Sequence, residues 1–247
     1  MRFKSLVLTS LMFASLALAG AGCGQQASVS TNTTGGKASD SCGNPYYPFK
    51  PGMAITYHET SKASAAGTDY TIRTVSVAGT TATIRAELAD GSTADMTADC
   101  ASGSVELKGS SSLGAAMQGT TFKTTIVSST GMSMPANVKA GSAWSNAETI
   151  RMDLSGGAAA SLGSITLTTT EQSRAISEES VTVPAGTFTA MKVELKRTST
   201  TVAKMGKIPP STQTSTEWWV KGIGMVKTVT VSQDGTSTIE AKSITGL

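Results

Sequence analysis

His58 is the only histidine in this chain of 247 residues, so any reaction that needs an imidazole depends on this one side chain. A metal site built from several histidines is excluded, and a Ser-His-Asp arrangement could use only His58. The residue lies in the alternating segment 54–59, AITYHE, which predicts a strand. A histidine on a surface or half-buried strand face is the simplest interpretation. The alternative is a hydrolase that uses His58 as its general base, and it is the weakest of our functional hypotheses.

Other side chains with catalytic or metal-binding potential lack the spacing that such chemistry needs. The chain contains neither a G-x-S-x-G nucleophile elbow nor an S-x-x-K serine-lysine pair. Its grouped carboxylates are Glu178, Glu179, Asp90, Asp95 and Asp99, and their spacing does not match an EF-hand loop. Carboxylates near turns are usually solvated, with a weak calcium site as the alternative. We therefore predict no catalytic residue, no resident metal and no cofactor.

The first residues of the chain predict export. Arg2 and Lys4 form a short positive region, an apolar run follows at 6–18, and small residues come next. This order is typical of a secretory signal peptide, which we place at 1–22.

The end of this segment indicates a lipid anchor. The sequence LAGAGC at 18–23 resembles a bacterial lipobox, although Gly20 stands where leucine is usual. We predict that Cys23 is lipidated. The alternative is an ordinary secreted protein that is cleaved near Ala21 and keeps Cys23 as a spare thiol.

The remaining cysteines form an even set. Without Cys23, the three cysteines of the chain leave Cys42 and Cys100 in an oxidising compartment. We predict that these two form a disulfide, which by loop entropy would stabilise the fold by about 4 kcal/mol.

The segment after the lipobox is polar, small and free of aromatic residues. This composition predicts a flexible tether over 23–41. A lipidated Cys23 would hold the chain on a membrane of the bacterial cell envelope, at its periplasmic or extracellular face. The sequence has no second apolar run of membrane-spanning length.

The charge of the chain argues against nucleic acid as a partner. The sequence has 20 basic and 17 acidic residues, and removal of the signal peptide takes away two of the basic ones, Arg2 and Lys4. The mature chain is then close to neutral, and its lysines and arginines are scattered, so it has no basic patch for phosphates.

Two segments of the chain read alike: AGTTATIRAEL at 78–88 and AGTFTAMKVEL at 185–195. In both, side chains alternate between two faces, which predicts strands with one buried and one wet face. A second correspondence lies upstream, where FKPGMAI at 49–55 parallels VKAGSAW at 138–144. The mature chain therefore reads as two divergent copies of one antiparallel β unit.

We place the first β repeat at 42–108, a connector at 109–131 and the second repeat at 132–247. Thr, Ser and Gly dominate, so the expected fold class is all-β. The duplicated units could form an open or half-closed barrel, or two packed curved sheets, and the sequence leaves this choice open. The further strands expected lie at 53–60, 69–77, 93–98, 143–154, 164–176, 212–220 and 225–231.

Trp218 and Trp219 are adjacent in one expected strand, so their side chains must leave opposite faces of the sheet. Glu217 and Lys221 share the face of Trp219. We therefore predict that Trp219 lies outside or in a cleft and that Trp218 faces the core.

Trp219 also belongs to a candidate aromatic patch for a ligand or partner. The other rings of this patch are Tyr46, Tyr47 and Phe49. The alternative is that these rings are structural and plug the ends of a barrel. The methionines have the same two interpretations, because they could line an adaptable apolar cavity or fill irregular core space. They are Met53, Met152, Met191, Met205 and Met225.

Several of these motifs resemble a known family. NPYYPFKPGMAITY at 44–57 resembles the YYPLxxGxxWxY opening of bacterial envelope proteins of unknown function, with Ile55 where tryptophan is common. Later motifs resemble VPAGTF at 183–188 and EWWVKGIGMVKT at 217–228. Over nearly all of its mature part the chain is similar to this family, sometimes labelled TapB-like. The resemblance implies an all-β lipoprotein with an open or half-closed barrel, similar in style to lipoprotein carriers, and it supplies no catalytic residue.

The function we expect is that of a non-enzymatic, membrane-anchored envelope lipoprotein. It would bind an apolar ligand, such as a lipid, or another envelope component. The alternative is a structural or surface-assembly protein that acts through protein–protein contacts.

Overall fold

The fold comes from a computed structural model of the chain. The residues that it describes are 42–62, 64–110, 122–154, 163–204 and 206–247. The predicted signal peptide, the Cys23 lipidation site and the tether lie outside these residues, as does the first part of the predicted connector. Across the described ranges, no helix has the length and apolar character needed to cross a membrane.

The described chain consists of antiparallel strands joined by turns. Threonine, valine and isoleucine are frequent in these strands, and their branched side chains suit a pleated, half-buried surface. The strands are β1 (Ala54–Ser61), β2 (Thr68–Ala78), β3 (Thr81–Leu88), β4 (Thr93–Ala101), β5 (Ser104–Lys108), β6 (Phe122–Gly131), β7 (Ala143–Leu154), β8 (Ser164–Val183), β9 (Gly186–Ala203), β10 (Gly206–Val220), β11 (Gly224–Ser232) and β12 (Gly235–Thr245).

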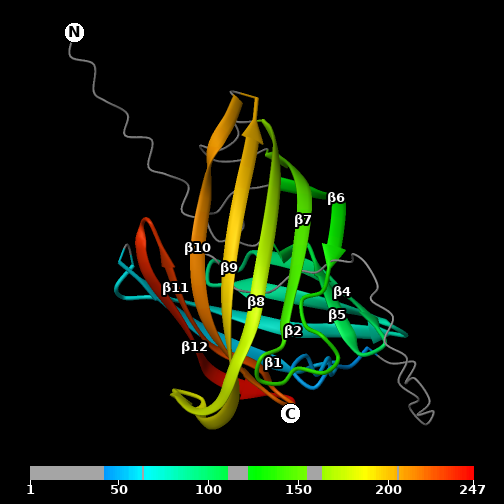
Figure 1. The fold of residues 1–247 in the computed structure, drawn as a ribbon, viewed down its shortest axis with the longest axis vertical. Helices are drawn as coiled ribbons and strands as arrows, with labels where there is room; N and C mark the ends of the chain where they lie inside the picture. Colours follow the sequence, from blue (N-terminus) through cyan, green and yellow to red (C-terminus); the bar gives the residue numbers. More distant parts are fainter. Residues whose placement is uncertain (1–41, 63, 111–121, 155–162, 205) are drawn as a thin grey trace.

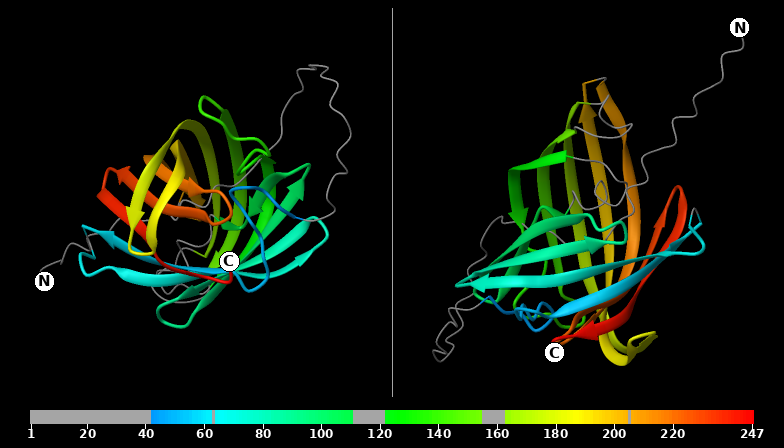
Figure 2. Two further views of the ribbon diagram at one scale, coloured as in Figure 1. Left: turned by 90° about the horizontal axis from the view of Figure 1, so that it is seen from below. Right: turned by 180° about the vertical axis from the view of Figure 1, so that it is seen from behind.

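All of these strands belong to one 12-stranded sheet, in the order β5-β4-β3-β2-β1-β12-β11-β10-β9-β8-β7-β6. The sheet curls into a nearly closed barrel with one unsealed seam, between the edge strands β5 and β6 (Figure 2). Strands β7 to β10 run upright in Figure 1, and β2, β4 and β5 cross behind them. At the seam, Val105 forms an isolated bridge with Met134. The all-β prediction is confirmed, and the half-closed barrel is the arrangement present.

The repeated turns of the sequence occupy equivalent places in the sheet. Gly52, before β1, donates its N–H to the carbonyl of Thr74 in β2, at 2.9 Å. Gly141, before β7, donates to the carbonyl of Ala175 in β8, also at 2.9 Å. Their φ angles are 85° and 87°, a left-handed conformation that glycine adopts without steric cost. The same type of turn therefore precedes both β1 and β7.

The similarity continues beyond these turns. A register shift follows Thr74 in the β2–β3 ladder, and another follows Ala175 in the β8–β9 ladder. Strand β12 takes the place beside β1 that β6 takes beside β7. The barrel therefore consists of two matching halves, and the last strand of the chain completes the first of them.

Part of the predicted connector is a strand. Residues 122–131 form β6, which pairs with β7 and ends the sheet at the seam. Ile126 is 42% exposed and Val127 is 60% exposed, so the apolar residues of β6 do not alternate between a buried and a wet face. An edge strand with little to bury lacks the pattern by which strands are recognised in a sequence.

Buried apolar side chains form two clusters. The larger is lined by strands of both halves, and Trp219 is the largest side chain in it that is fully buried. The smaller lies on β7 and β8 and consists of Ile150, Met152, Ile165 and Leu167. Side chains on the same sheet face between these clusters are polar.

The segment before β1 crosses the lower opening of the barrel (Figure 2, left). Cys42 and Cys100 are joined by a disulfide, with their Cα atoms 5.0 Å apart, as the cysteine count predicts. Asn44 Nδ2 donates to the carbonyl of Gly103 at 2.7 Å, and the carbonyl of Pro45 accepts the N–H of Gly222 at 2.7 Å. These bonds hold the aromatic residues that follow against the core.

Candidate functional site

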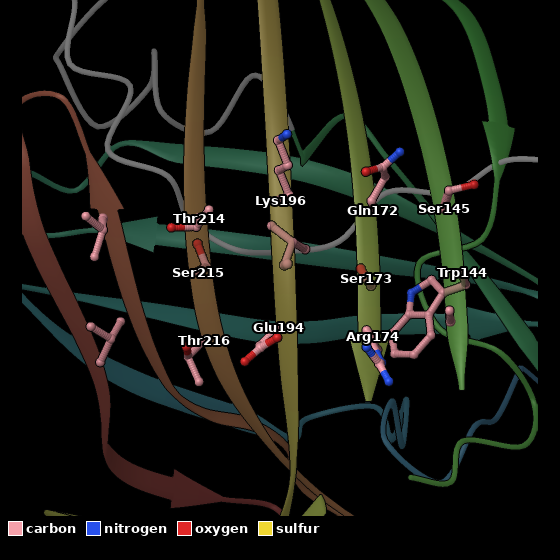
Figure 3. Close-up of a pocket in the computed structure, with 14 residues that line it drawn as sticks. Trp144, Ser145, Gln172, Ser173, Arg174, Glu194, Lys196, Thr214, Ser215 and Thr216 are labelled. Atoms are coloured by element: carbon pink, nitrogen blue, oxygen red, sulfur yellow. The ribbon is translucent and has the colours of Figure 1, made fainter. Parts of the chain in front are cut away.

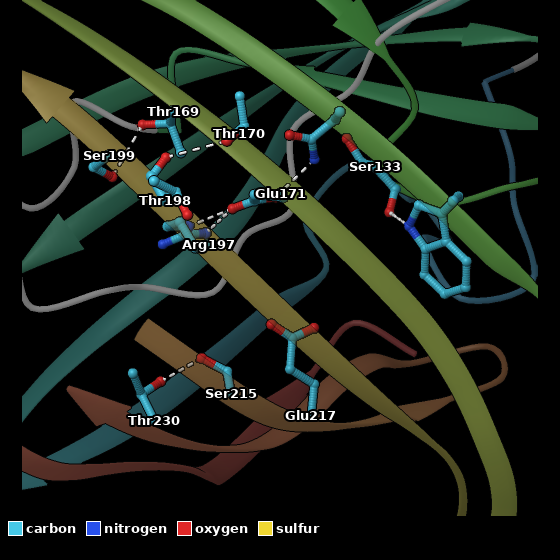
Figure 4. A network of polar contacts seen from close by, with 12 residues as sticks. Ser133, Thr169, Thr170, Glu171, Arg197, Thr198, Ser199, Ser215, Glu217 and Thr230 are labelled. Atoms are coloured by element: carbon cyan, nitrogen blue, oxygen red, sulfur yellow. Dashed lines mark hydrogen bonds and ion pairs between the residues drawn. The ribbon is translucent and has the colours of Figure 1, made fainter. Parts of the chain in front are cut away.

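The inner faces of β7, β8 and β9 carry a buried polar cluster between the two apolar ones (Figure 4). Glu171 of β8 accepts a hydrogen bond from Asn146 Nδ2 at 2.7 Å and forms an ion pair with Arg197 of β9. The side chain of Glu171 is 3% exposed and that of Arg197 is 12% exposed. A pair so far from water depends on both partners, because removal of one leaves a buried charge alone.

Glu217 of β10 lies on the same inner face and is 1% exposed. Its Oε2 accepts a hydrogen bond from Trp219 Nε1 at 2.8 Å, whereas its Oε1 has no hydrogen-bond partner in the described structure. Burial raises the pKa of Glu217 to about 8, against a downward pull from the Trp219 hydrogen bond and a further rise from the Glu171 carboxylate. Near neutral pH, Glu217 is therefore mostly protonated.

Tyr47 packs beside Trp219 in the surroundings of this carboxyl group. Its ring centroid lies 4.8 Å from that of Trp219 and 5.5 Å from that of Phe49. Its hydroxyl group is buried and has no hydrogen-bond partner among the described residues. Burial raises the pKa of Tyr47 well above its usual value, and Glu217 and Tyr57 raise it further.

The structure thus brings together the rings of the predicted aromatic patch, but inside the barrel. Tyr46 is 2% exposed, Tyr47 7% and Trp219 1%, and Phe49 packs against the same core. The burial of these rings agrees with the plug given as the alternative, and their binding of a ligand or partner stays a prediction.

The predicted orientation of the tryptophan pair is also wrong. Trp219 and Glu217 face inward, whereas Trp218 is half-buried on the outer side and donates Nε1–H to Glu179 Oε1 at 2.8 Å. The prediction assumed that a glutamate marks the wet face, and here the glutamate is itself buried. A bulge in β11, where Trp218 pairs with Lys227 and Trp219 with Met225, changes the register at this point.

The structure contains a groove of about 800 Å³ on the outer side of β7 to β11 (Figure 3). Cross-strand pairing aligns its lining in two transverse rows. One row is Ala143, Arg174, Glu194, Thr216 and Val229, and the other is Ser145, Gln172, Lys196, Thr214 and Val231.

The centre of the groove is charged. Arg174 and Glu194 are opposite each other on β8 and β9, and Gln172 and Lys196 are opposite each other one step along. All four side chains are exposed. Among the described residues, neither Arg174, Glu194 nor Lys196 forms an ion pair. These charges are available to a ligand that spans the strands.

His58 lies away from both features, on the outer side of β1. Its Nδ1 is 2.6 Å from Asp69 Oδ1, and Asp69 Oδ2 accepts a hydrogen bond from Lys242 Nζ at 2.5 Å. The Lys242 and His58 hydrogen bonds hold the pKa of Asp69 below its usual value. On the other side of the ring, Gly67 sits so close to Nε2 that a Cβ there would overlap it. His58 therefore belongs to a partly exposed hydrogen-bonded group on the outer side of the barrel, in which Lys242 and Asp69 form the ion pair.

Comparison with known proteins adds a family. A family model described as DUF3108-like matches residues 53–238, which is most of the chain. The chain belongs to this DUF3108-like family. The narrower TapB-like resemblance stays a prediction. A search of curated proteins returned no match.

Two solved structures have a similar fold. One is a protein from Bacteroides fragilis described as exported and as having a YmcC-like fold, with a TM-score of 0.57 and 15% identity. It covers 82% of this chain, and the match includes 100% of its own chain. The other, from Parabacteroides distasonis, is described as a lipoprotein, with a TM-score of 0.57, 16% identity and coverage of 82% and 99%. At these identities the likeness concerns the fold.

Sequence reasoning missed most of the polar residues that this DUF3108-like barrel brings together. Glu171, Arg197 and Asn146 come from three strands, and no local motif connects them. No sequence signal marked Glu217 as buried, because a glutamate in an alternating strand is normally found on the wet face. Within the described residues there is no group of three or more His, Cys, Asp or Glu side chains that could hold a metal ion.

Proposed function

We propose that this protein is an exported envelope lipoprotein, tethered through Cys23, that binds another envelope component rather than catalysing a reaction. Support for export comes from the signal-peptide pattern at 1–22 and from the descriptions of the two similar structures as exported and as a lipoprotein. Support for a binding role comes from the groove across β7 to β11.

The observation that carries the proposal is the character of this groove. Its volume of about 800 Å³ lies within the range of ligand sites. Two cationic groups, Arg174 and Lys196, flank the carboxylate of Glu194. Hydroxyl groups lie in both rows and the amide of Gln172 in one, with apolar side chains at the ends beyond them. The matching ligand is an extended, polar envelope molecule with both acidic and basic groups.

An apolar ligand is less well supported. The methionines that could have lined an apolar cavity instead occupy the core: Met53 is 5% exposed, Met152 0%, Met191 4% and Met225 3%. Met205 lies outside the described residues. The groove on the outer sheet face is the better candidate because its charged side chains are exposed and form no ion pair with other described residues.

Photo-crosslinking in intact cells tests this role. A benzoylphenylalanine at Thr214, exposed in the groove, should yield a specific adduct with an envelope component, whereas one at Thr97, exposed on the outer face of β4, should not. Reversing both cations, with Arg174→Glu and Lys196→Glu, should lower the adduct yield about tenfold, since each exposed charge contact contributes up to about 1 kcal/mol. Equal adduct yields at both positions would refute the groove as the binding site.

A further inference from the structure

The interior of the barrel holds more carboxyl groups than cations. Four glutamates are buried: Glu59, Glu148, Glu171 and Glu217. Among the described residues the mostly buried cation on this face is Arg197, whose guanidinium group is paired with Glu171. An ionised carboxylate is costly to bury, so each of these groups must be paired, hydrogen-bonded or held neutral. Glu148 accepts the N–H of Gly109 and Glu171 is paired with Arg197, whereas Glu217 lacks a cation among the described residues.

Glu217 and Tyr47 are groups that the protein itself leaves unsatisfied. Glu217 Oε1 and the Tyr47 hydroxyl are both buried, with residue exposures of 1% and 7%, and neither has a hydrogen-bond partner in the described structure. Buried polar atoms almost always have a partner, and each one left without it costs about 1–3 kcal/mol. Two such atoms around the Trp219 ring indicate that something else completes the site.

The described surroundings supply no internal partner for these oxygens. Trp219 already donates Nε1–H to the other oxygen of Glu217, and its ring packs against Tyr47. The hydroxyl of Tyr57 donates to the carbonyl of Met225 at 2.8 Å. The described neighbours are therefore largely aromatic, and once Glu217 is ionised the two remaining oxygens can both accept a hydrogen bond.

We propose that Glu217 and Tyr47 form an internal site for a protonated primary amine, with the Glu217 carboxylate as its counter-ion and the Tyr47 oxygen as a second acceptor. An ammonium group offers three donors and one positive charge. It can donate to both unpartnered oxygens and supplies a counter-ion for the ionised Glu217 carboxylate. A divalent metal is a poor alternative, because the described residues offer no cluster of three or more suitable ligands.

Binding at this site has a proton signature. The empty site holds Glu217 as a neutral acid near pH 7, since its pKa is raised to about 8 by burial. The other charged and titratable groups that act on this site are Glu171, Arg197, Tyr47 and Tyr57. An ammonium ion needs the ionised form, so Glu217 must lose its proton as the ion pair forms. About one proton is released for each amine bound, and affinity rises with pH until Glu217 is ionised in the empty protein.

The amine could belong to a small molecule or to a lipid head group, and titration calorimetry distinguishes them. The mature protein is titrated with ethanolamine, and separately with vesicles of phosphatidylethanolamine or phosphatidylglycerol, at pH 6.5, 7.5 and 8.5 in buffers of different ionisation enthalpy. We expect release of close to one proton at pH 6.5, less at pH 7.5 and only a minor fraction of one at pH 8.5, with binding up to about tenfold tighter per pH unit below pH 8. Binding of ethanolamine indicates a free amine, and binding of phosphatidylethanolamine vesicles alone indicates a lipid head group.

Three variants complete the test. Glu217→Gln should abolish proton-linked binding, and Tyr47→Phe should weaken it several-fold without removing the proton release. Glu87→Gln, at a partly exposed position on the outer side of β3 and outside the groove, is the matched control and should bind like the wild type. The proposal is overturned if wild-type protein binds none of the amine probes, if binding is independent of pH, or if Glu217→Gln protein that has a wild-type circular dichroism spectrum still binds. None of these outcomes depends on the outer groove.

Discussion

Glu217 should make the protein less stable as the pH rises, and Glu217→Gln should remove that dependence. The carboxyl group is buried in the fold with a pKa of about 8, against about 4.5 for an exposed glutamate. The folded state therefore holds a proton that the unfolded state has already lost throughout this interval. The stabilising effect of that proton is complete below pH 4.5 and is lost as the pH rises through 8.

The size of this stability change follows from the difference between the pKa values of Glu217 in the folded and unfolded states. Each pH unit between the two pKa values changes the free energy of unfolding by up to about 1.4 kcal/mol, so the whole interval amounts to about 4–5 kcal/mol. The amide that Glu217→Gln introduces does not ionise, and it keeps an acceptor oxygen for Trp219 Nε1. We expect this variant to match the wild type within about 1 kcal/mol at pH 5 and to exceed its stability by about 3–4 kcal/mol at pH 9.

Urea unfolding, followed by tryptophan fluorescence with the disulfide intact, measures this difference at unit steps from pH 5 to pH 9. Glu59 is also buried with a raised pKa, but it is present in both proteins and cancels in the comparison. Glu194→Gln, an exposed change on the opposite face of the sheet, should follow the wild-type curve. If Glu217→Gln and wild type lose stability in parallel as the pH rises, Glu217 is not a buried neutral acid and the reasoning fails.

Three further changes test the rest of the fold. Arg197→Met leaves Glu171 buried without its ion-pair partner and should cost about 3–5 kcal/mol in urea unfolding at pH 7, whereas a loss below about 1 kcal/mol would mean that water reaches the pair. Cys100→Ser removes the disulfide and should lower stability by about 2–4 kcal/mol under oxidising conditions, with no difference from the reduced wild type. Gly67→Ala would place a Cβ 2.8 Å from a backbone carbonyl oxygen and against the ring of His58, so it should lower the melting temperature by several degrees, and an unchanged temperature would contradict this packing.

Strands with one buried and one wet face were predictable from their own residues. The segment 143–154 was expected as a strand and forms β7 with these bounds, and the expected strands at 53–60 and 225–231 differ from β1 and β11 by one residue at each end. The even cysteine count also predicted the Cys42–Cys100 pair. Alternation of apolar and polar residues is visible within one strand, and the number of cysteines can be counted in the sequence. Neither requires knowledge of which strands pair with one another.

Other features depend on which strands meet. β6 lies at the seam with Ile126 and Val127 exposed, so its sequence carries no alternation, and β5 and β12 were likewise not anticipated. The sequence predicts the wrong face for Trp219 because a glutamate two positions away usually indicates a solvent-exposed face. Only the closure of the barrel removes water from Glu217, and a side chain's solvation is a property of everything packed around it.

The sequence by itself determined the all-β class, the duplicated unit, the disulfide and the expectation of export, because composition, periodicity and repeats express these directly. The tertiary structure decided that the two copies share one sheet, that the aromatic residues before β1 plug its opening, and that Glu171, Arg197 and Glu217 meet inside it. Cross-strand neighbours come from positions far apart in the chain, and their register is set by turns and bulges. The chemistry of the interior and of the groove therefore arises only when the strands pair.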